Sequence, residues 1–372
     1  MPVKCRDIFN IIEDIAPCRL AESWDSVGLQ VGDPRGVVDR VLLSLDVNLG
    51  VAKEAKEKGA GLIISHHPLM LKPPGVISLE HPFGELVGYL IKNDITVYTA
   101  HTNLDVAVGG VNSALASRLG LSNPFVLHKT GQERYVKLAL FVPVSHAESV
   151  LSAVSEAGAG WIGNYSHCTF MITGVGTFKP LAGTNPYIGK TGEMERVEEV
   201  KLETIVPAGR LDPVVRAMLR VHPYEEVAYD LYPLENAARA HGLGRVGTLE
   251  EPLSFRLFAE KVKASLALPA ARLGGAPESK VKKVAVCGGS GADFWPDALR
   301  AGADTIVTGD VKYHVAQDML ASGLKFIDAG HFGTEVLVLP ALQNDLANRC
   351  SEAGIKVEFI ISRTNTDPFT YF

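Results

Sequence analysis

The chain has 372 residues, of which 47% are hydrophobic and 21% charged, so we expect most of it to fold, into two or three domains. Its net charge of −6 gives little support to nucleic-acid binding, and no apolar stretch reaches the ~18–20 residues that a membrane span needs. Five scattered cysteines without a CxxC pair indicate reduced thiols, and the first residues lack the apolar core of a secretory signal. These features predict a cytoplasmic protein.

The first third of the chain alternates helices with strands. We predict helices over residues 4–15, 51–58 and 83–93, and strands over 41–45, 61–65 and 95–99. Strands that alternate with helices at this spacing predict βαβ units and a largely parallel sheet.

The pattern changes between about residues 135 and 233 to strand, helix, strand, strand, helix, strand, which is the order of a ferredoxin-like unit. A short Ala/Gly segment at 237–244 is then expected to be a linker. After it, we predict helices over 255–266, 295–301 and 311–322, and strands over 281–287, 305–308 and 324–328. The sequence thus predicts one α/β body, built from segments 1–130 and 237–372, interrupted by an α+β insert at 131–236.

The two segments of the α/β body share a short internal repeat. Each contains a Gly-Ala-x-x-Ile strand, a helix, a second strand and a His-x-x-x-carboxylate motif, which is His101 to Asp105 in the first segment and His331 to Glu335 in the second. Parallel strands gather functional groups at their carboxyl ends. We therefore predict two similar βα halves that face one another across a cleft with a dinuclear metal site.

The candidate ligands at these strand ends are histidines and carboxylates, namely His66, His67, His101, Asp105, Asp310, His331 and Glu335. Imidazole and carboxylate without thiolate suit Zn, Mn, Fe, Co or Ni better than an iron–sulfur cluster or calcium. Two carboxylates neutralise only part of the charge of two divalent ions, so an anionic ligand such as a phosphate is favoured. Paired metal ions about 3.5–4 Å apart can activate water for hydrolysis.

Three features of the sequence leave alternatives open. Asp310 either contributes to the site or caps the helix that follows it. His314, one turn into that helix, faces either a substrate or solvent. The loop 287–292 (CGGSGA) either cradles a phosphate with its backbone amides or forms only a tight turn between a strand and a helix.

Several longer motifs carry a family resemblance: WDSVGLQVGD (24–33), ISHHPLM (64–70), AHTNLDVAVGGVN (100–112), CGGSGAD (287–293), TGDVKYH (308–314) and DAGHFGTE (328–335). With these motifs the chain resembles the NGG-interacting-factor-three family, whose members are named GTP cyclohydrolase I type 2 homologs. The middle segment, with WIGNY at 161–165 and HPYEE at 222–226, is similar to the PII/CutA-like domain of the longer bacterial members.

The resemblance implies two divalent metal ions per chain, with zinc as the first choice and Mn, Fe, Co or Ni as alternatives. The implied metal ligands are His66, His67, Asp105, His331 and Glu335, with Glu335 as the bridging ligand. His101 also matches a family motif and ranks below these five. The resemblance further implies a toroidal homohexamer whose metal sites face an interior cavity.

Two hypotheses about function follow. The first is a metal-dependent hydrolase, GTP cyclohydrolase-like or phosphoesterase-like, that acts on a nucleotide-like or phosphorylated small molecule with His101 or His314 as general acid or base. The alternative is a non-catalytic metal-binding ring assembly with a regulatory or ligand-sensing role. The two hypotheses differ in whether bound metal supports turnover.

Overall fold

The computed structural model describes residues 2–236 and 240–371, which form two compact units. The first unit combines the chain up to Thr130 with the chain from His241 onward, and the second comprises Gly131–Ala240. None of the described helices is both long and apolar enough to cross a membrane.

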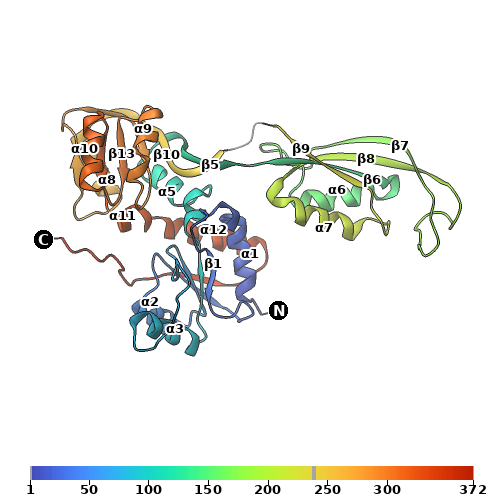
Figure 1. The fold of residues 1–372 in the computed structure, drawn as a ribbon, viewed down its shortest axis with the longest axis horizontal. Helices are drawn as coiled ribbons and strands as arrows, with labels where there is room; N and C mark the ends of the chain where they lie inside the picture. Colours follow the sequence, from blue (N-terminus) through green and yellow to red (C-terminus); the bar gives the residue numbers. More distant parts are fainter. Residues whose placement is uncertain (1, 237–239, 372) are drawn as a thin grey trace. The chain divides into compact units, whose positions relative to one another are not determined.

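The first unit contains a five-stranded sheet in the order β1-β4-β3-β2-β15 (Figure 1). Strands β2, β3, β4 and β15 are parallel, and β1 is antiparallel to β4. The bounds are Gly28–Val31 for β1, Arg40–Ser44 for β2, Leu62–Ser65 for β3, Thr96–Thr99 for β4 and Glu358–Ile361 for β15. The predicted strands β2, β3 and β4 are confirmed with small shifts of their ends.

Helices cover both faces of this sheet, because consecutive strand residues point to opposite sides and both sides are apolar here. Leu43 packs on one face with helices α1 and α12, and its neighbour Leu42 packs on the other face with α2 and α3. The helices span Cys5–Ile15 (α1), Leu49–Glu57 (α2), Pro82–Lys92 (α3) and Val338–Glu352 (α12).

The second sheet of this unit has the order β11-β14-β13-β12-β10-β5. Strands β12, β13 and β14 are parallel, while β11 runs antiparallel to β14 and β10 runs antiparallel to β12. The bounds are Ser122–Gln132 for β5, Ala240–Ser254 for β10, Arg272–Gly274 for β11, Lys280–Val286 for β12, Thr305–Thr308 for β13 and Lys325–Asp328 for β14. The expectation of a largely parallel sheet, made for the first third of the chain, holds for the first sheet. In the second sheet the three predicted strands, β12, β13 and β14, are parallel, whereas β5, β10 and β11 were not predicted, and β10 and β11 add antiparallel pairs.

Four helices pack on the second sheet, two on each face. Val284 contacts the core formed with α5 and α8, and Ala285 contacts the core formed with α9 and α10. These helices span Val111–Arg118 (α5), Phe255–Ser265 (α8), Trp295–Arg300 (α9) and Tyr313–Ala321 (α10). Short 3-10 turns lie at Cys18–Leu20, Val144–His146, Ala208–Arg210 and Ala292–Phe294.

Each sheet of this unit also contains elements from the other of the two chain segments that form the unit. Helix α12 and strand β15, from the end of the chain, join the sheet of the first segment, whereas α5 and β5 join the sheet of the second. Each sheet contains a parallel trio followed by an antiparallel strand, β2-β3-β4-β1 in one and β12-β13-β14-β11 in the other. The repeated sequence pattern therefore has a counterpart in the strand order.

The predicted linker at 237–244 is wrong from Ala240 onward, because those residues begin strand β10. Glycines are typical of linkers, but here they are needed because the backbone of β10 passes very close to neighbouring atoms. A Cβ at Gly242 would come within 2.0 Å of the His128 carbonyl oxygen, and Gly244 has a φ of +66°. Residues 237–239 of the predicted linker lie outside the described residues.

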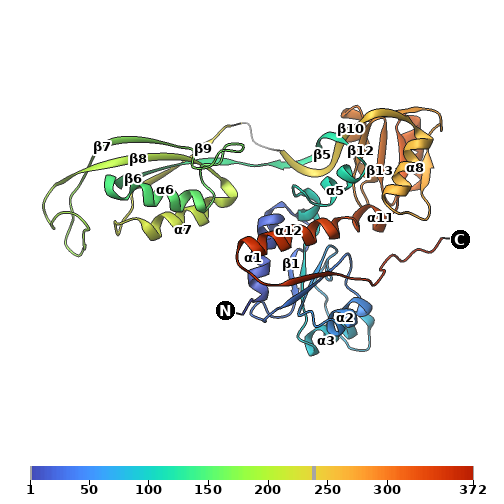
Figure 2. The ribbon, with the colours of Figure 1, turned by 180° about the vertical axis from the view of Figure 1, so that it is seen from behind.

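The second unit is a four-stranded antiparallel sheet in the order β7-β8-β6-β9, with α6 and α7 on one face (Figures 1 and 2). Leu140 and Leu202 of the sheet pack with Val150 of α6 and Met218 of α7. The bounds are Tyr135–Pro143 (β6), Ala147–Glu156 (α6), Thr169–Phe178 (β7), Glu195–Pro207 (β8), Leu211–Val221 (α7) and Tyr229–Leu234 (β9). The predicted element order of the insert is thus observed.

Candidate metal centre

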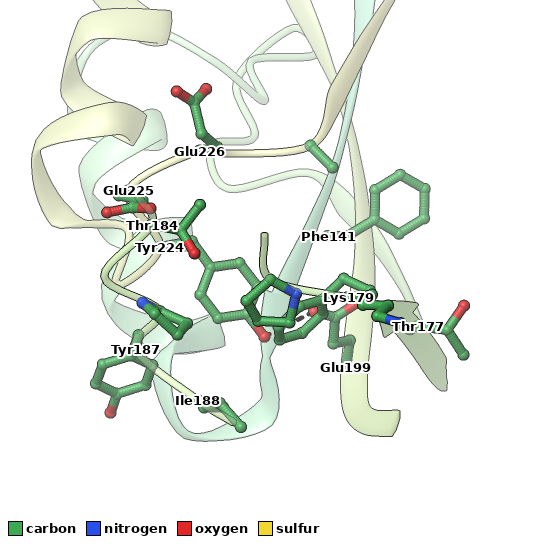
Figure 3. Close-up of a pocket in the computed structure, with 15 residues that line it drawn as sticks. Phe141, Thr177, Lys179, Thr184, Tyr187, Ile188, Glu199, Tyr224, Glu225 and Glu226 are labelled. Atoms are coloured by element: carbon green, nitrogen blue, oxygen red, sulfur yellow. Dashed lines mark hydrogen bonds between the residues drawn. The ribbon is translucent and has the colours of Figure 1, made fainter. Parts of the chain in front are cut away.

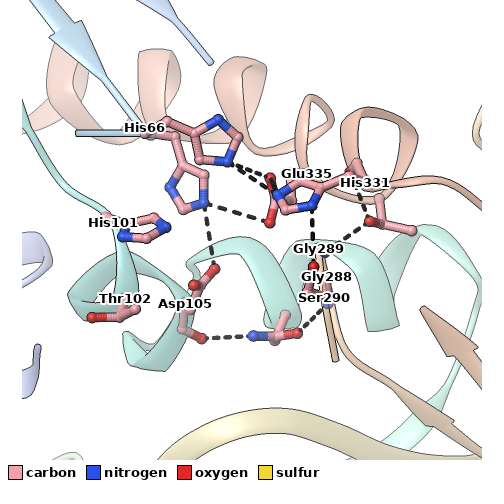
Figure 4. A network of polar contacts seen from close by, with 12 residues as sticks. His66, His101, Thr102, Asp105, Gly288, Gly289, Ser290, His331 and Glu335 are labelled. Carbon is pink, nitrogen blue, oxygen red and sulfur yellow. Dashed lines mark hydrogen bonds and ion pairs between the residues drawn. The ribbon is translucent and has the colours of Figure 1, made fainter. Parts of the chain in front are cut away.

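The residues predicted as metal ligands gather in the first unit, at the carboxyl ends of two strands of the first sheet and one strand of the second. His66 and His67 directly follow β3. The next strand, β4, is followed by His101 and by helix α4 (Thr102–Val106), which carries Asp105. Strand β14 is followed by α11 (His331–Glu335), which begins at His331 and ends at Glu335. Segments far apart in the sequence thus supply one cluster of side chains (Figure 4).

Glu335 lies at the centre of this cluster and is 3% exposed. Its Oε2 atom is 2.9 Å from Nε2 of His67 and 3.2 Å from Nε2 of His331. Its Oε1 atom is 3.8 Å from Nε2 of His66. Each carboxylate oxygen thus faces a different histidine set, which is the arrangement of a bridging carboxylate.

Three groups of side chains among the described residues could hold a metal ion. In each group the candidate ligand atoms lie within 4.8 Å of one another. The groups are His66, Asp105 and Glu335; His67, His331 and Glu335; and His66, His67 and His101. Glu335 belongs to both the first and the second group. The third group shares His66 with the first and His67 with the second, so the three groups form one continuous set of donors.

Two buried donor atoms in this set have no hydrogen-bond partner among the described residues. They are Nε2 of His66 and Oδ1 of Asp105, which are 3.6 Å apart. A buried polar atom left without a partner costs about 1–3 kcal/mol, so such atoms are retained where something else satisfies them. A divalent cation fits, because both atoms are lone-pair donors that zinc-type ions bind.

The Nδ1 atom of each histidine in the cluster donates a hydrogen bond that turns Nε2 toward the other ligands. The acceptors are the Ala100 carbonyl for His66 at 2.9 Å, Asp46 for His67 at 2.7 Å, Asp25 for His101 at 2.8 Å and Asp310 for His331 at 2.7 Å. A metal-binding histidine typically has its second nitrogen held in this way, which fixes its tautomer and orientation.

Sequence reasoning did not single out Asp25 or Asp46, although Asp25 lies within the motif at 24–33 and Asp46 lies at a strand end. Asp46 comes just after β2, the strand next to β3, so the strand-end argument that found His66 also applies to it. Asp25 lies in the loop before β1, where no strand pattern marks it. Its side chain is 0% exposed and also accepts hydrogen bonds from the Thr102 backbone amide and hydroxyl.

Asp310 orients His331 and does not cap a helix. It accepts hydrogen bonds from Nδ1 of His331 and from the Ser290 hydroxyl, while the residue that begins α10 as its N-cap is Lys312. The cap alternative considered from the sequence is therefore wrong.

His314 lies on α10 as an exposed residue, with Nδ1 3.3 Å from the Gln317 side-chain oxygen. It belongs to none of the three ligand groups found among the described residues. Among the described residues, no contact between His314 and the cluster supports a catalytic role, and that role stays a prediction.

The glycine loop after β12 supports Glu335 and uses its backbone amides internally. The amides of Gly288, Gly289 and Gly291 donate to side chains of Asn112, Thr334 and Thr308 at 2.9, 2.9 and 3.0 Å, respectively. These amides are not free to cradle a phosphate, so the tight-turn alternative is the correct one for them.

Gly289 makes room for the central carboxylate. Its φ is +60°, and a Cβ there would lie 2.2 Å from Oε1 of Glu335 and 3.1 Å from Nε2 of His331. Only glycine adopts this backbone conformation at little cost while leaving that space empty.

Burial and charge shift the protonation of the cluster in opposite directions. Burial raises the pKa of Asp105 to about 6. Burial would also raise the pKa of Glu335, but hydrogen bonds from His331 and His67, together with the charge of His66, hold it well below its usual range. Burial alone would lower the pKa of His67, but Asp46 and Glu335 raise it to about 10. Without a cation the cluster binds protons, so metal binding would release them.

Cys287 is buried beside this site but is a poor ligand candidate. Burial, together with the charges of Asp105 and Glu335, raises the pKa of its thiol. The side chain is 3% exposed and belongs to none of the ligand groups of the described residues. A neutral thiol does not bind metal as a thiolate does.

A cavity of about 410 Å³ adjoins the cluster on the side of His67 and His331. Asp46 and Asp310 line it, as does the carboxyl-terminal segment 366–369. The Thr366 hydroxyl donates a 2.5 Å hydrogen bond to Asp46, so this segment is bonded to the carboxylate that orients His67.

Comparison with known proteins identifies the family of the chain. The sequence profile of the Duf34/NIF3 (NGG1p interacting factor 3) family matches residues 3–368. The chain belongs to this family. Relatives named GTP cyclohydrolase 1 type 2 homolog occur in Halalkalibacterium halodurans, at 45% identity over 98% of both chains, and in Bacillus subtilis, at 44% identity over 99% of both chains.

Solved structures of the Duf34/NIF3 family have the same mixed α/β fold with several sheets. The crystal structure of a Bacillus cereus protein related to NIF3 is similar over 100% of both chains, with a TM-score of 0.91 and 44% sequence identity. A Staphylococcus aureus protein of 32% identity is similar with a TM-score of 0.75, over 100% of this chain and 99% of that chain. The family predicted from the sequence motifs is confirmed.

Proposed function

We propose that this chain is a metal-dependent hydrolase that binds two divalent ions and acts on a nucleotide-like or phosphorylated small molecule. One observation carries the proposal: a buried carboxylate, Glu335, is shared between two groups of histidine and carboxylate donors. The two unpartnered buried atoms, on His66 and Asp105, support the presence of a cation between them.

The candidate ligands fall into two sets, one for each proposed metal ion. His66 and Asp105 would hold one ion and His67 and His331 the other, with Glu335 between them. Zinc is our first choice because the donors are imidazoles and carboxylates, and Mn, Fe, Co or Ni remain alternatives. When bound, a pair of such ions supplies Lewis acidity and lowers the pKa of water.

His101 is the best placed candidate for proton transfer. Its Nδ1 atom donates to buried Asp25, and its ring lies 5.2 Å from that of His66 and 5.6 Å from that of His67, measured between centroids. His101 belongs to the ligand group of His66 and His67, and its hydrogen bond to Asp25 fixes the orientation of the ring. Such a residue can act as general acid or base, or as a further ligand.

The substrate class rests on charge, size and relatives. The cluster holds two acidic ligands for two divalent ions, which favours an anionic substrate. The cavity of about 410 Å³ beside His67 and His331 matches a small molecule. The relatives' name, GTP cyclohydrolase 1 type 2 homolog, supports a nucleotide, with either a C–N bond or a phosphoester as the bond cleaved.

The test is turnover after metal replacement. The chelated protein is reloaded with Zn, Mn, Fe or Co and assayed with GTP and a panel of phosphoesters, beside a His101→Asn variant. We expect turnover that depends on metal and falls steeply in His101→Asn without loss of metal. A fully loaded protein that turns over no substrate would contradict the hydrolase proposal and favour the non-catalytic regulatory assembly.

Two further proposals concern organisation. The insert has both helices on one face and the strand order β7-β8-β6-β9, which supports a ferredoxin-like, PII/CutA-like domain. By family resemblance we also propose a cytoplasmic toroidal homohexamer with the metal sites facing its interior. Measurement of the native mass in solution tests the assembly, and a monomer would contradict it.

A further inference from the structure

The insert has a cavity of its own, of about 400 Å³, lined only by residues of the second unit. Its walls come from β6, β7 and β8, from the loop after β7 and from the segment between α7 and β9 (Figure 3). A cavity of this size accommodates a small organic molecule. The chemistry of its walls indicates which kind.

A buried carboxylate lies in the wall of this cavity. Glu199, on β8, is 8% exposed, and its Oε1 atom accepts a 2.9 Å hydrogen bond from the Tyr224 hydroxyl (Figure 3). No hydrogen bond from a described residue reaches its Oε2 atom, and no lysine or arginine of the described chain forms an ion pair with it. Burying a carboxylate without a countercharge is costly, so a cationic partner is expected.

The neighbouring strand makes room for this carboxylate. A Cβ at Gly176, on the neighbouring strand β7, would lie 1.9 Å from Oε2 of Glu199. Glycine at this position therefore allows Glu199 to occupy its place in the cavity wall. Its φ is not in the left-handed region, so the reason for glycine is the carboxylate and not the backbone.

Aromatic rings form much of the remaining wall. The ring centroid of Tyr224 lies 5.8 Å from that of Phe178 and 6.4 Å from that of Tyr187, with the planes inclined by 60° and 51°. Phe141 also lines the cavity. The faces of such rings attract cations, most strongly alkylammonium and guanidinium groups that are removed from water.

The balance of charge around the cavity also favours a cation. Glu225 and Glu226 line it with Glu199, against one basic residue, Lys179. Glu225 accepts the Asn185 backbone amide at 3.2 and 3.3 Å, which fixes the loop over the cavity. Burial, followed by the hydrogen bond to Glu199, raises the pKa of Tyr224, so its hydroxyl stays protonated and donates to the carboxylate.

We propose that the insert binds a small organic cation, an amine, guanidine or quaternary ammonium compound, with its charge against Glu199 and its carbon atoms against the rings of Phe178, Tyr187 and Tyr224. The site is separate from the metal centre and does not depend on the proposed hydrolase activity. It gives the insert a ligand of its own.

The test is equilibrium binding to the purified full chain by titration calorimetry with choline, agmatine and putrescine, and with glutamate as an anionic comparison. We expect saturable binding of at least one cation and none of glutamate. Glu199→Gln, which keeps the shape of the side chain, should weaken binding about tenfold or more, because the negative charge that attracts the cation and strengthens any hydrogen bond from an amine or guanidine is lost. Glu156→Gln, an exposed change on α6 outside the cavity, should leave binding unchanged.

Two further variants protect the test against misfolding of Glu199→Gln. Tyr187 is 54% exposed, so Tyr187→Ala should fold and still weaken binding of the cation. Lys179→Gln should leave or strengthen cation binding, whereas it would weaken the binding of an anion. The proposal is overturned if none of the three cations binds at millimolar concentration, if Glu199→Gln binds as the wild type does, or if glutamate binds instead.

Discussion

Removal of the Asp46 carboxylate tests whether the carboxylates behind the histidines tune the metal centre. Asp46 accepts a 2.7 Å hydrogen bond from Nδ1 of His67, and its side chain is 37% exposed, so truncation leaves little cavity. Loss of such a supporting group typically weakens metal affinity by 10–100-fold. We therefore expect Asp46→Ala to bind metal about 1.4–2.7 kcal/mol less tightly than the wild type.

The assay is competition with a coloured chelator of known affinity, at constant pH and ionic strength. Asp39→Ala provides a matched control, because Asp39 is an exposed aspartate of the same unit that does not line the cavity beside the metal centre. Equal metal affinity in Asp46→Ala and wild type would refute the reasoning. Loss of affinity in both variants would show a nonspecific effect of removing surface charge.

Two further predictions concern stability and space. Although burial alone would raise the pKa of Glu54, hydrogen bonds from Lys58 and from residues 362–364 hold it well below its ordinary value of 4.5. Its stabilisation is therefore complete above pH 4.5 and declines as the pH falls from there toward the lowered pKa of the folded state. Glu54→Gln should unfold about 1–3 kcal/mol more easily at pH 7 in denaturant titrations, and the difference from the wild type should be smaller at pH 3 than at pH 7. A pH-independent difference would contradict this. Gly289→Ala, which places a methyl group against Glu335, should fold with reduced metal content by elemental analysis; full metal content would show that the carboxylate can shift freely.

The sequence predicts the cluster well because its residues follow simple local rules. His66 directly follows strand β3, and His101 and His331 come two and three residues after the ends of β4 and β14. The strand-end rule brings such positions together without knowledge of the packing. The His-x-x-x-carboxylate spacing then places Asp105 and Glu335 one helical turn further on. Local pattern and topology together bring these five residues into one neighbourhood, and their roles as metal ligands stay a prediction.

Other parts of the fold depend on contacts that a linear pattern does not show. Strand β10 begins in a segment rich in alanine and glycine, where glycine is needed because the backbone passes close to His128. Strand β15 adds to the first sheet from the far end of the chain, and only its pairing with β2 identifies its place. Asp25 supports His101 from a loop, where neither period nor spacing marks it.

The most direct test of the central claim is metal content by elemental analysis of the purified chain and of Glu335→Ala. The account predicts close to two divalent ions per wild-type chain and a loss of both in the variant, since Glu335 is shared by both ligand groups. A wild-type chain without metal, or a Glu335→Ala chain that retains the wild-type content, would contradict it.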